Sequence, residues 1–401
     1  MKLRKLSQLA LASGTGLAVA ATLTACQLVT VDYVFLTGSG GIQTFAVDSE
    51  SGALRYANNT GTTPASSGGK TPVALAVDNT YSDLYVANSD NNSVVHFTIA
   101  ADGSLTKADS VTTSDVPTAV AVTPSGSNLF VVTGSGTADA TLTEYALSSG
   151  KIGSVVTQEA LTIPGYSGDS VIPTSVTVLA NGAGVYATVY DQSAYNPGGT
   201  TTSTANPGWV FGFAIGSGGG LSPAANSPYR AGVKPSAIVA EPASRFVYIT
   251  DFASNQLIGY SITSSTTLNF LISGPYKTGN QPSAVAVDPR GKFIYVTNAL
   301  DSTVSAFAID LTTGIPSAAL NTSGATTNST DTQPNGVVVE PAEGRYAYTA
   351  NTLGNSISGF RMNVNTGVLT QTQNTPYPSQ KTPTAIVAVP HGNHSLQVIA
   401  D

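Results

Sequence analysis

The chain has 401 residues, of which 41% are hydrophobic and only 10% are charged, with 16 Lys and Arg against 23 Asp and Glu. This composition is sufficient for a large core, and the formal charge of −7 makes nucleic acid an unlikely class of partner. The single cysteine excludes an intrachain disulfide and any site that needs several thiolates.

The first 26 residues have the pattern of a secretory signal. MKLRK is a basic start, residues 6–25 are mostly Ala, Leu, Thr and Gly, and no stop-transfer pattern follows. The segment ends in LTAC (Leu23 to Cys26), which resembles the lipobox of bacterial lipoproteins, where the cysteine becomes the lipid-carrying N-terminus. We therefore expect an exported protein of the cell envelope, periplasmic or at the surface, anchored to a membrane through Cys26. The alternative is an ordinary signal peptide followed by an unrelated cysteine.

After residue 26 the chain repeats one unit of three short strands. In QPSAVAVDPRGKFIYVTNALDSTVSAFAIDLTTG (Gln281 to Gly314) apolar and polar residues alternate, and the alternation breaks at DPRG and at NALDS. One such unit cannot bury its own apolar face, so repetition is required. Three series each occur seven times: an aromatic on the second strand, an aromatic on the third, and a proline opening the first. These are Tyr33, Tyr85, Phe130, Tyr186, Tyr248, Tyr295 and Tyr348; Phe45, Phe97, Tyr145, Phe213, Tyr260, Phe307 and Phe360; and Pro72, Pro117, Pro173, Pro235, Pro282, Pro334 and Pro383.

This count predicts an all-β fold, a seven-bladed β-propeller of four-stranded antiparallel blades. The N-terminal part starts at a second strand, DYVFLTG, and the missing first strand appears as TPTAIVAVP from Thr382. One blade is therefore closed by both termini, and residues 27–401 are expected to form a single domain. The final SLQVIAD has no assigned place, and an incomplete eighth blade is a weaker alternative.

The longest insertions are all expected on one face of the propeller. They span residues 57–70, 160–171, 191–208 and 321–332, and they join either second to third strands or one blade to the next. Long loops in compact domains are often functional, so this face is the candidate binding face. The alternative is that these Thr, Ser and Gly-rich loops are tolerated without a role.

Polar residues end most of the second strands on that same face. They are Asn88, Asp191, Asp251, Asn298 and Asn351, while Thr37 and Thr133 stand near the equivalent place in two blades. One interpretation is a ring at the channel mouth that binds sugar hydroxyls or a Ca²⁺ ion. The other, which we favour, is that Asn and Asp satisfy amides of the turns. If the chain is an enzyme, Asp191 and Asp251 are the candidates for activating water.

Cations of the same face lie close to the anchoring prolines. Lys70, Lys234 and Lys381 each precede such a proline by one or two residues, which suggests an anion-binding cluster. Asp115, Asp169 and Asp331 occupy comparable loops, so a solvated face of mixed charge is the alternative. The three histidines, His96, His391 and His394, lack the spacing of metal ligands, and no nucleophile elbow or phosphate loop is present. No metal site or other cofactor is expected beyond the Ca²⁺ already considered.

The repeat resembles two related groups, the YVTN-repeat propellers and the lactonase family, which includes 6-phosphogluconolactonase-like enzymes. IYVTN stands at Ile294 to Asn298, and PVALAVDNTYSDLYVANSDNNSVVHFTIAADGSL runs from Pro72 to Leu105. The resemblance covers about residues 31–395 and implies the propeller fold and hydrolysis of a lactone ring ester. The arginine or lysine cluster that a phosphorylated lactone needs is missing, so an uncharged or carboxylated lactone is expected. The alternatives are a non-catalytic envelope lipoprotein that binds a protein or glycan through its loops, and, less strongly, a structural surface-layer role.

Overall fold

The computed structural model describes residues 29–57, 64–137, 140–163, 171–192, 208–263, 266–319 and 323–392. Cys26 and the terminal residues 396–401, for which the sequence analysis made predictions, lie outside the described residues. The described part is built from strands β1 to β32, and it has no helix long and apolar enough to cross a membrane.

Seven sheets form the ring, and the strands of each follow one another from the centre outward. Three have four strands: β32 (Ile386–Pro390), β1 (Thr30–Gly38), β2 (Gly41–Asp48) and β3 (Leu54–Tyr56); β4 (Pro72–Val77), β5 (Asp83–Asn88), β6 (Ser93–Ile99) and β7 (Leu105–Thr112); β8 (Pro117–Val122), β9 (Asn128–Thr133), β10 (Thr141–Ser148) and β11 (Lys151–Ala160). Two of the others are β12 (Val171–Val178), β13 (Gly184–Asp191), β14 (Gly208–Ile215), β15 (Leu221–Pro223) and β16 (Tyr229–Arg230); β17 (Pro235–Ala240), β18 (Phe246–Asp251), β19 (Gln256–Ile262), β20 (Leu268–Phe270) and β21 (Tyr276–Lys277). The last two are β22 (Pro282–Val287), β23 (Phe293–Asn298), β24 (Thr303–Ile309), β25 (Pro316–Ala318) and β26 (Thr327–Ser329); β27 (Pro334–Val339), β28 (Tyr346–Asn351), β29 (Ser356–Met362), β30 (Leu369–Gln371) and β31 (Tyr377–Pro378).

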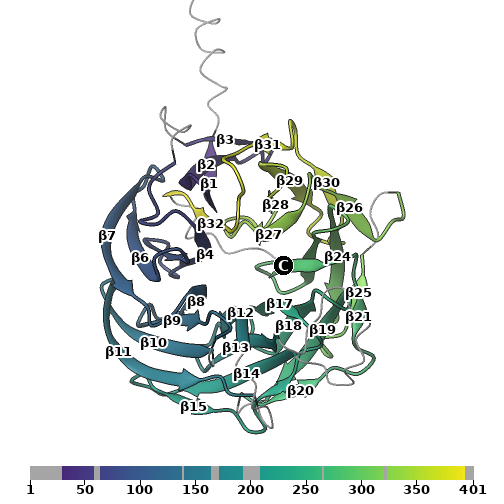
Figure 1. Ribbon diagram of the computed structural model, residues 1–401. Helices are drawn as coiled ribbons and strands as arrows, with labels where there is room; N and C mark the ends of the chain where they lie inside the picture. Colours follow the sequence, from purple (N-terminus) through teal and green to yellow (C-terminus); the bar gives the residue numbers. More distant parts are fainter. Residues whose placement is uncertain are drawn as a thin grey trace, which may run out of the picture.

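The predicted seven-bladed propeller is confirmed, as is its closure by both ends of the chain. The inner strands β4, β8, β12, β17, β22, β27 and β32 surround a central channel (Figure 1). In the closing blade β32 pairs with β1, with Tyr33 opposite Val389 and Leu36 opposite Ile386. This pairing joins residues more than 300 positions apart, and it completes the ring without an exposed inner edge.

Four blades differ from the predicted four strands, because their outer strand is divided in two. In the blade of β12 to β16, for example, β14 pairs with β15 near Phe213 and with β16 near Trp209. The blades that begin at β17, β22 and β27 show the same division. The chain turns away between the two pieces, so each piece covers only part of the third strand.

The core lies between neighbouring blades, and the second-strand tyrosines connect them. The Tyr248 hydroxyl donates to the carbonyl of Gly314 (2.8 Å) and that of Tyr348 to the carbonyl of Gly52 (2.7 Å), each in a turn of the next blade. Tyr85, Tyr186 and Tyr295 make the same kind of bond. Each tyrosine thus buries its ring and still satisfies its hydroxyl.

In the closing blade, the sequence analysis assigned the wrong residue as the second-strand aromatic. The pairing register places Phe35, not Tyr33, at the position of Tyr85, and Phe35 is fully buried. By the same register Gly38, not Thr37, corresponds to Asn88. Tyr33 stands two residues earlier, where Phe246 and Tyr346 stand in other blades, and it packs on the turn glycine Gly103.

Replacing Gly314 with alanine is expected to destabilise the protein by about 2 kcal/mol. Gly314 has φ +76°, and an added Cβ would lie 2.3 Å from the Phe246 ring. Gly126→Ala is the matched control, since Gly126 has φ +67° but nothing within 4 Å of an added Cβ. It should cost about 1 kcal/mol from backbone strain alone. Urea unfolding measures both, and equal costs would show that the contact with Phe246 is unimportant.

Candidate functional site

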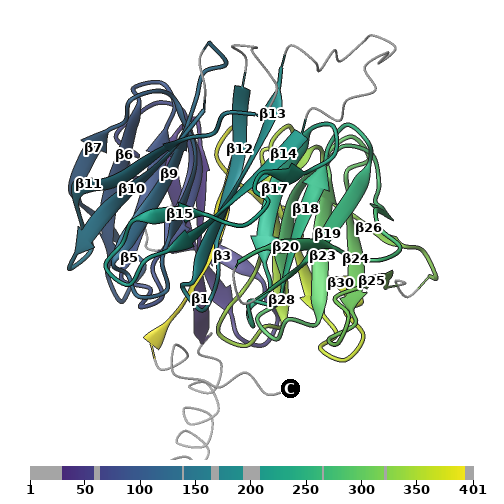
Figure 2. The same ribbon diagram turned by 90° about the horizontal axis from the view of Figure 1, so that it is seen from below.

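The two faces of the ring are distinguished by the strand ends. We call the loop face the one where first strands begin and second strands end, and the turn face the opposite one, where β1 begins and β32 ends (Figure 2). The insertions 160–171 and 191–208 join strands at the loop face, although part of each lies outside the described residues. The prediction was wrong for much of 57–70 and 321–332, which interrupt an outer strand: Ala65 still bridges Ile42 of β2, and β26 still pairs with β24. Tight turns such as Asp288–Gly291 lie on the turn face.

The central channel contains a cavity of about 280 Å³ that all seven inner strands line. Its polar residues directly follow the anchoring prolines: Thr118, Thr174, Ser236, Ser283, Asn335 and Thr384, with Val73 in the remaining blade. Since these positions open the first strands, the polar part of the cavity lies towards the loop face. The sequence analysis missed this ring, although a small hydroxyl residue after five of the seven prolines was a visible signal.

Hydroxyl groups of this ring fasten several of the blades to the next. Ser236 Oγ donates to the Pro282 carbonyl (2.6 Å), Ser283 Oγ to that of Pro334 (2.7 Å) and Thr384 Oγ1 to that of Pro72 (2.7 Å). Where Asn335 takes the place of the hydroxyl, Thr352 Oγ1 donates to the Pro383 carbonyl instead (2.7 Å). The channel mouth is therefore a rigid polar rim.

The predicted ring of strand-end residues lies inside the blades. Asn88, Asp191, Asp251, Asn298 and Asn351 are all buried, and none of them lines the channel cavity. Asn88 Nδ2 donates to the Ser67 carbonyl (2.9 Å), and Asn298 Oδ1 accepts from the backbone of Gly279 (3.0 Å). Asn351 Nδ2 donates to Ser356 Oγ and Ser358 Oγ. These contacts are the kind expected of residues that hold turns.

Asp251 holds the loop that carries Lys234. Its carboxylate accepts from the backbone amides of Val233 and Lys234 (both 2.9 Å), from Ala253 (3.3 Å) and from Gln256 Nε2 (3.0 Å). These four donors occupy the acceptor sites of the carboxylate. Asp191 does not stand at the corresponding position. The register places Val189 opposite Pro173, as Asp251 is opposite Pro235, and Asp191 is buried two residues further on, opposite Val171.

The three candidate lysines have different surroundings. Lys70 and Lys381 are exposed, and each lies in the loop that leads to a different blade. Lys234 is half-buried, and its Nζ lies 4.8 Å from the Phe252 ring and 5.4 Å from the Tyr190 ring. Burial lowers the pKa of Lys234 below its usual value, because desolvation disfavours the ammonium form. Lys234 is thus the candidate with a distinctive chemical environment.

A second cation–π pair lies on the other face of the same blade. Arg230 Cζ lies 3.9 Å from the ring of Trp209, to which it is paired across β14 and β16. Tyr190 lies opposite Gly208 and Trp209 opposite Val189, so the two rings point to opposite faces of the sheet, and Trp209 packs towards the blade of β8 to β11. We call Tyr190, Lys234 and Phe252 the cation–aromatic cluster. One cation beside two aromatic faces suits a ligand with a negative or oxygen-rich end and an apolar ring.

The sequence analysis missed the aromatic half of this cluster. Tyr190 and Phe252 each lie next to a predicted strand-end aspartate. Their role depends on how β13 and β18 approach each other in the ring, which a single repeat does not indicate.

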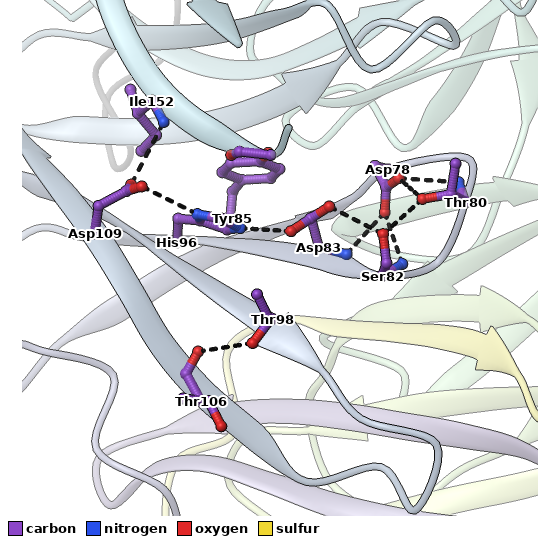
Figure 3. A network of polar contacts seen from close by, with 11 residues as sticks. Asp78, Thr80, Ser82, Asp83, Tyr85, His96, Thr98, Thr106, Asp109 and Ile152 are labelled. Atoms are coloured by element: carbon purple, nitrogen blue, oxygen red, sulfur yellow. Dashed lines mark hydrogen bonds and ion pairs between the residues drawn. The ribbon is translucent and has the colours of Figure 1, made fainter. Parts of the chain in front are cut away.

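His96 belongs to a separate polar network in the blade of β4 to β7, shown in Figure 3. Its Nε2 lies 2.6 Å from Asp83 Oδ1 and its Nδ1 lies 3.3 Å from Asp109 Oδ2, and the ring stacks on Tyr85. The side chain is buried between strands. His391 lies on the turn face against Tyr33, and His394 is outside the described residues. The described residues include no group of three His, Cys, Asp or Glu that would hold a metal ion.

Residues 29–166 and 220–323, more than half of the chain, match the family model described as lactonase, 7-bladed beta-propeller. The chain belongs to this lactonase family. No curated protein matches it in sequence. Among solved structures it is similar to a periplasmic gluconolactonase of Pseudomonas aeruginosa (TM-score 0.72, 18% identity, covering 90% of this chain and 100% of the other). A candidate 6-phosphogluconolactonase of Bacteroides uniformis (0.70, 17%, 89% and 99%) and a protein of Lactobacillus plantarum (0.69, 15%, 90% and 100%) are also similar.

At these identities the solved structures support the fold alone, and the lactonase family model leaves a gap at the site. The unmatched stretch between residues 166 and 220 contains Tyr190, Asp191 and Trp209. Arg230, Lys234 and Phe252 lie within the matched part. The cation–aromatic cluster therefore joins the part matched by the lactonase family model to a segment outside that match.

Proposed function

We propose that this lactonase-family protein hydrolyses a lactone, with the ring ester bound at the loop-face mouth of the channel. The observation that carries the proposal is the half-buried ammonium of Lys234, held between aromatic rings at the start of an inner strand. Hydrolysis of a ring ester places negative charge on the carbonyl oxygen and then forms a carboxylate. A fixed, partly desolvated cation stabilises both.

In this proposal Asp251 acts as a positioning residue. It binds the backbone amide of Lys234, so it orients the lysine without touching the substrate. The Tyr190 and Phe252 rings limit the access of water to Nζ and offer an apolar surface for the lactone ring. Asp191, the other predicted carboxylate, is the candidate for activating water; it is buried at the loop-face end of β13 and does not line the channel cavity, so this role requires that water reach it.

The substrate class follows from the charges at this mouth. Lys234 lies against two aromatic rings, and a single cation suits one carboxylate or a set of hydroxyl groups. An uncharged or carboxylated lactone therefore fits better than a phosphorylated one. An exported protein would meet such lactones outside the cytoplasm, in keeping with the LTAC sequence at Cys26 and with the periplasmic gluconolactonase of similar fold.

Lys234→Met should lower kcat/KM for lactone hydrolysis by about a hundredfold, because methionine keeps the volume but removes the charge. The matched control is Lys292→Met, an equal change in a tight turn of the turn face. Acid release from a panel of sugar and aliphatic lactones, followed by pH-stat, measures both. The protein used is a soluble form from Gln27, which contains every strand of the ring.

Asp191→Asn tests the assignment of the base in the same assay. A loss of kcat with little change in KM supports it. Equal turnover by the wild type, Lys234→Met and Asp191→Asn would show that the active site does not lie at the loop-face mouth. A folded protein with no turnover on any lactone would instead favour the non-catalytic alternative, a lipoprotein that binds a protein or glycan.

A further inference from the structure

Arg345 and Arg361 line a groove on the turn face, at the opposite end of the ring from the cation–aromatic cluster. Its cavity volume is about 600 Å³. Arg345 directly precedes β28, and Arg361 lies on β29 opposite Tyr346. The groove has both polar and apolar walls, formed further by Met362, Asn363, Val364, Asn365, Val368 and Thr370.

These two guanidinium groups are available, unlike those of the neighbouring arginines. The Arg290 side chain is 6% exposed and donates to two backbone carbonyls, and Arg245 is bound to a buried glutamate and a carbonyl. The Arg345 side chain is 54% exposed, with a single ion pair of 3.4 Å to Glu343. Arg361 is exposed, and it makes no ion pair within the described part of the chain.

We propose that this arginine groove binds a phosphate group. Two guanidinium forks can bind the oxygens of one phosphate bidentately, whereas a single carboxylate needs only one fork. The side-chain amides of Asn363 and Asn365 add neutral donors at the same groove. A bound anion would have to share Arg345 with Glu343, whose side chain is only 18% exposed; the Arg345 side chain is 54% exposed and leaves room for the anion on its solvent side.

The position of the groove indicates a membrane lipid as the source of the phosphate. The Tyr346 hydroxyl donates to the Ser49 carbonyl (3.1 Å), and the Ser49 amide donates to the Val29 carbonyl (3.0 Å). Two hydrogen bonds thus connect the groove's blade to the place where the chain enters the ring. Cys26 stands three residues before Val29, a reach of about 10 Å at most. A lipid on Cys26 would hold the turn face against the headgroups; this step rests on the proposed anchoring, whereas phosphate binding itself does not.

The experiment compares a soluble form from Gln27 with its Arg345→Gln/Arg361→Gln variant. One arm titrates inorganic phosphate at low salt by calorimetry. The other arm measures flotation with vesicles of phosphatidylcholine, alone or mixed with phosphatidylglycerol. The control variant is Lys107→Gln/Lys151→Gln, which removes the same charge from exposed positions of two other blades. Lactone turnover should be the same in all three proteins, because none of these residues lies at the loop-face mouth.

We expect the double arginine variant to bind phosphate at least about tenfold more weakly, with the control close to wild type. The lipid source is supported if the wild type and the control variant float with phosphatidylglycerol vesicles and the arginine variant does not. Phosphate binding without flotation keeps the groove and overturns the lipid source. A wild type that binds no phosphate, or an arginine variant that binds it equally well, overturns the proposal. Neither phosphate binding nor flotation of this soluble form depends on lactone turnover or on lipidation of Cys26. The proposed function is therefore tested separately.

Discussion

Replacing Asp251 with alanine is expected to lower the free energy of unfolding by about 4 kcal/mol, because four donors lose their acceptor together. The side chain is fully buried, and three of the donors are backbone amides that cannot turn towards solvent. The fourth, Gln256 Nε2, is the only one that can rotate away. Urea unfolding of the variant measures the loss.

Asp90→Ala is the matched control for this change. Asp90 accepts from the backbone amides of Lys70 and Thr71 (3.0 Å), which is the same arrangement in another blade, but its side chain is exposed. Water can take its place, so we expect a loss below about 1 kcal/mol. Similar small losses in the two variants would show that Asp251 is not the buried anchor of the Lys234 loop.

Asp32→Asn is expected to stabilise the protein by about 3 kcal/mol in mildly alkaline solution and to change little in mild acid. Asp32 is fully buried, and neither of its oxygens has a donor among the described residues. Burial, followed by the charge of Glu340, raises the pKa of Asp32 well above its ordinary value of 3.8. Burial also raises the pKa of Glu340, but the backbone amides of Glu343 and Arg345 donate to its carboxylate and oppose this effect.

The sign of the pH effect follows from proton binding. An acid with a raised folded-state pKa binds more protons when folded, so stability is greatest in acid. It falls as the pH rises from about 3.8 through the raised pKa of Asp32. The asparagine keeps a donor for Glu340 but cannot ionise, so its unfolding free energy should vary less with pH.

Unfolding free energies measured across this pH range test the effect. The control is Asp102→Asn, an exposed residue whose pKa is lowered by the Ser104 hydroxyl and amide. Its contribution to stability is lost only as the pH falls through that lowered pKa. The prediction is wrong if the unfolding free energies of Asp32→Asn and the wild type vary with pH in parallel, because Asp32 would then be ionised already in the folded protein.

The fold could be predicted because its determinants repeat. Each anchoring proline lies at or near the end of a second strand, as Pro282 does opposite Asn298. The proline series therefore located the inner strands. The assignment failed where two aromatics share one side of a strand. Tyr33 and Phe35 are two residues apart, and the shorter connection to β2 shifts the register, so Tyr33 took the place of Phe35 in the count.

The site was less predictable because it depends on contacts between blades. Asn88, Asp251, Asn298 and Asn351 do recur opposite the anchoring prolines, whereas Asp191 lies two residues beyond the equivalent Val189. The hydrogen bonds of Asn88 and Asn298 agree with the turn-holding role that we favoured. The approach of Lys234 to Tyr190, 44 positions earlier, arises only when the blades of β12 and β17 pack together. The hydroxyl rim was obscured because Ser and Thr are abundant throughout the chain.

The central claim is that this lactonase-family propeller hydrolyses lactones at the loop-face mouth of its channel. The most direct measurement is acid release by pH-stat from gluconolactone and from an uncharged aliphatic lactone at neutral pH, with the soluble protein from Gln27. The account predicts turnover well above the spontaneous rate, and loss of that turnover in Lys234→Met but not in Lys292→Met. A rate equal to the spontaneous one with folded protein, or full activity in Lys234→Met, would contradict it.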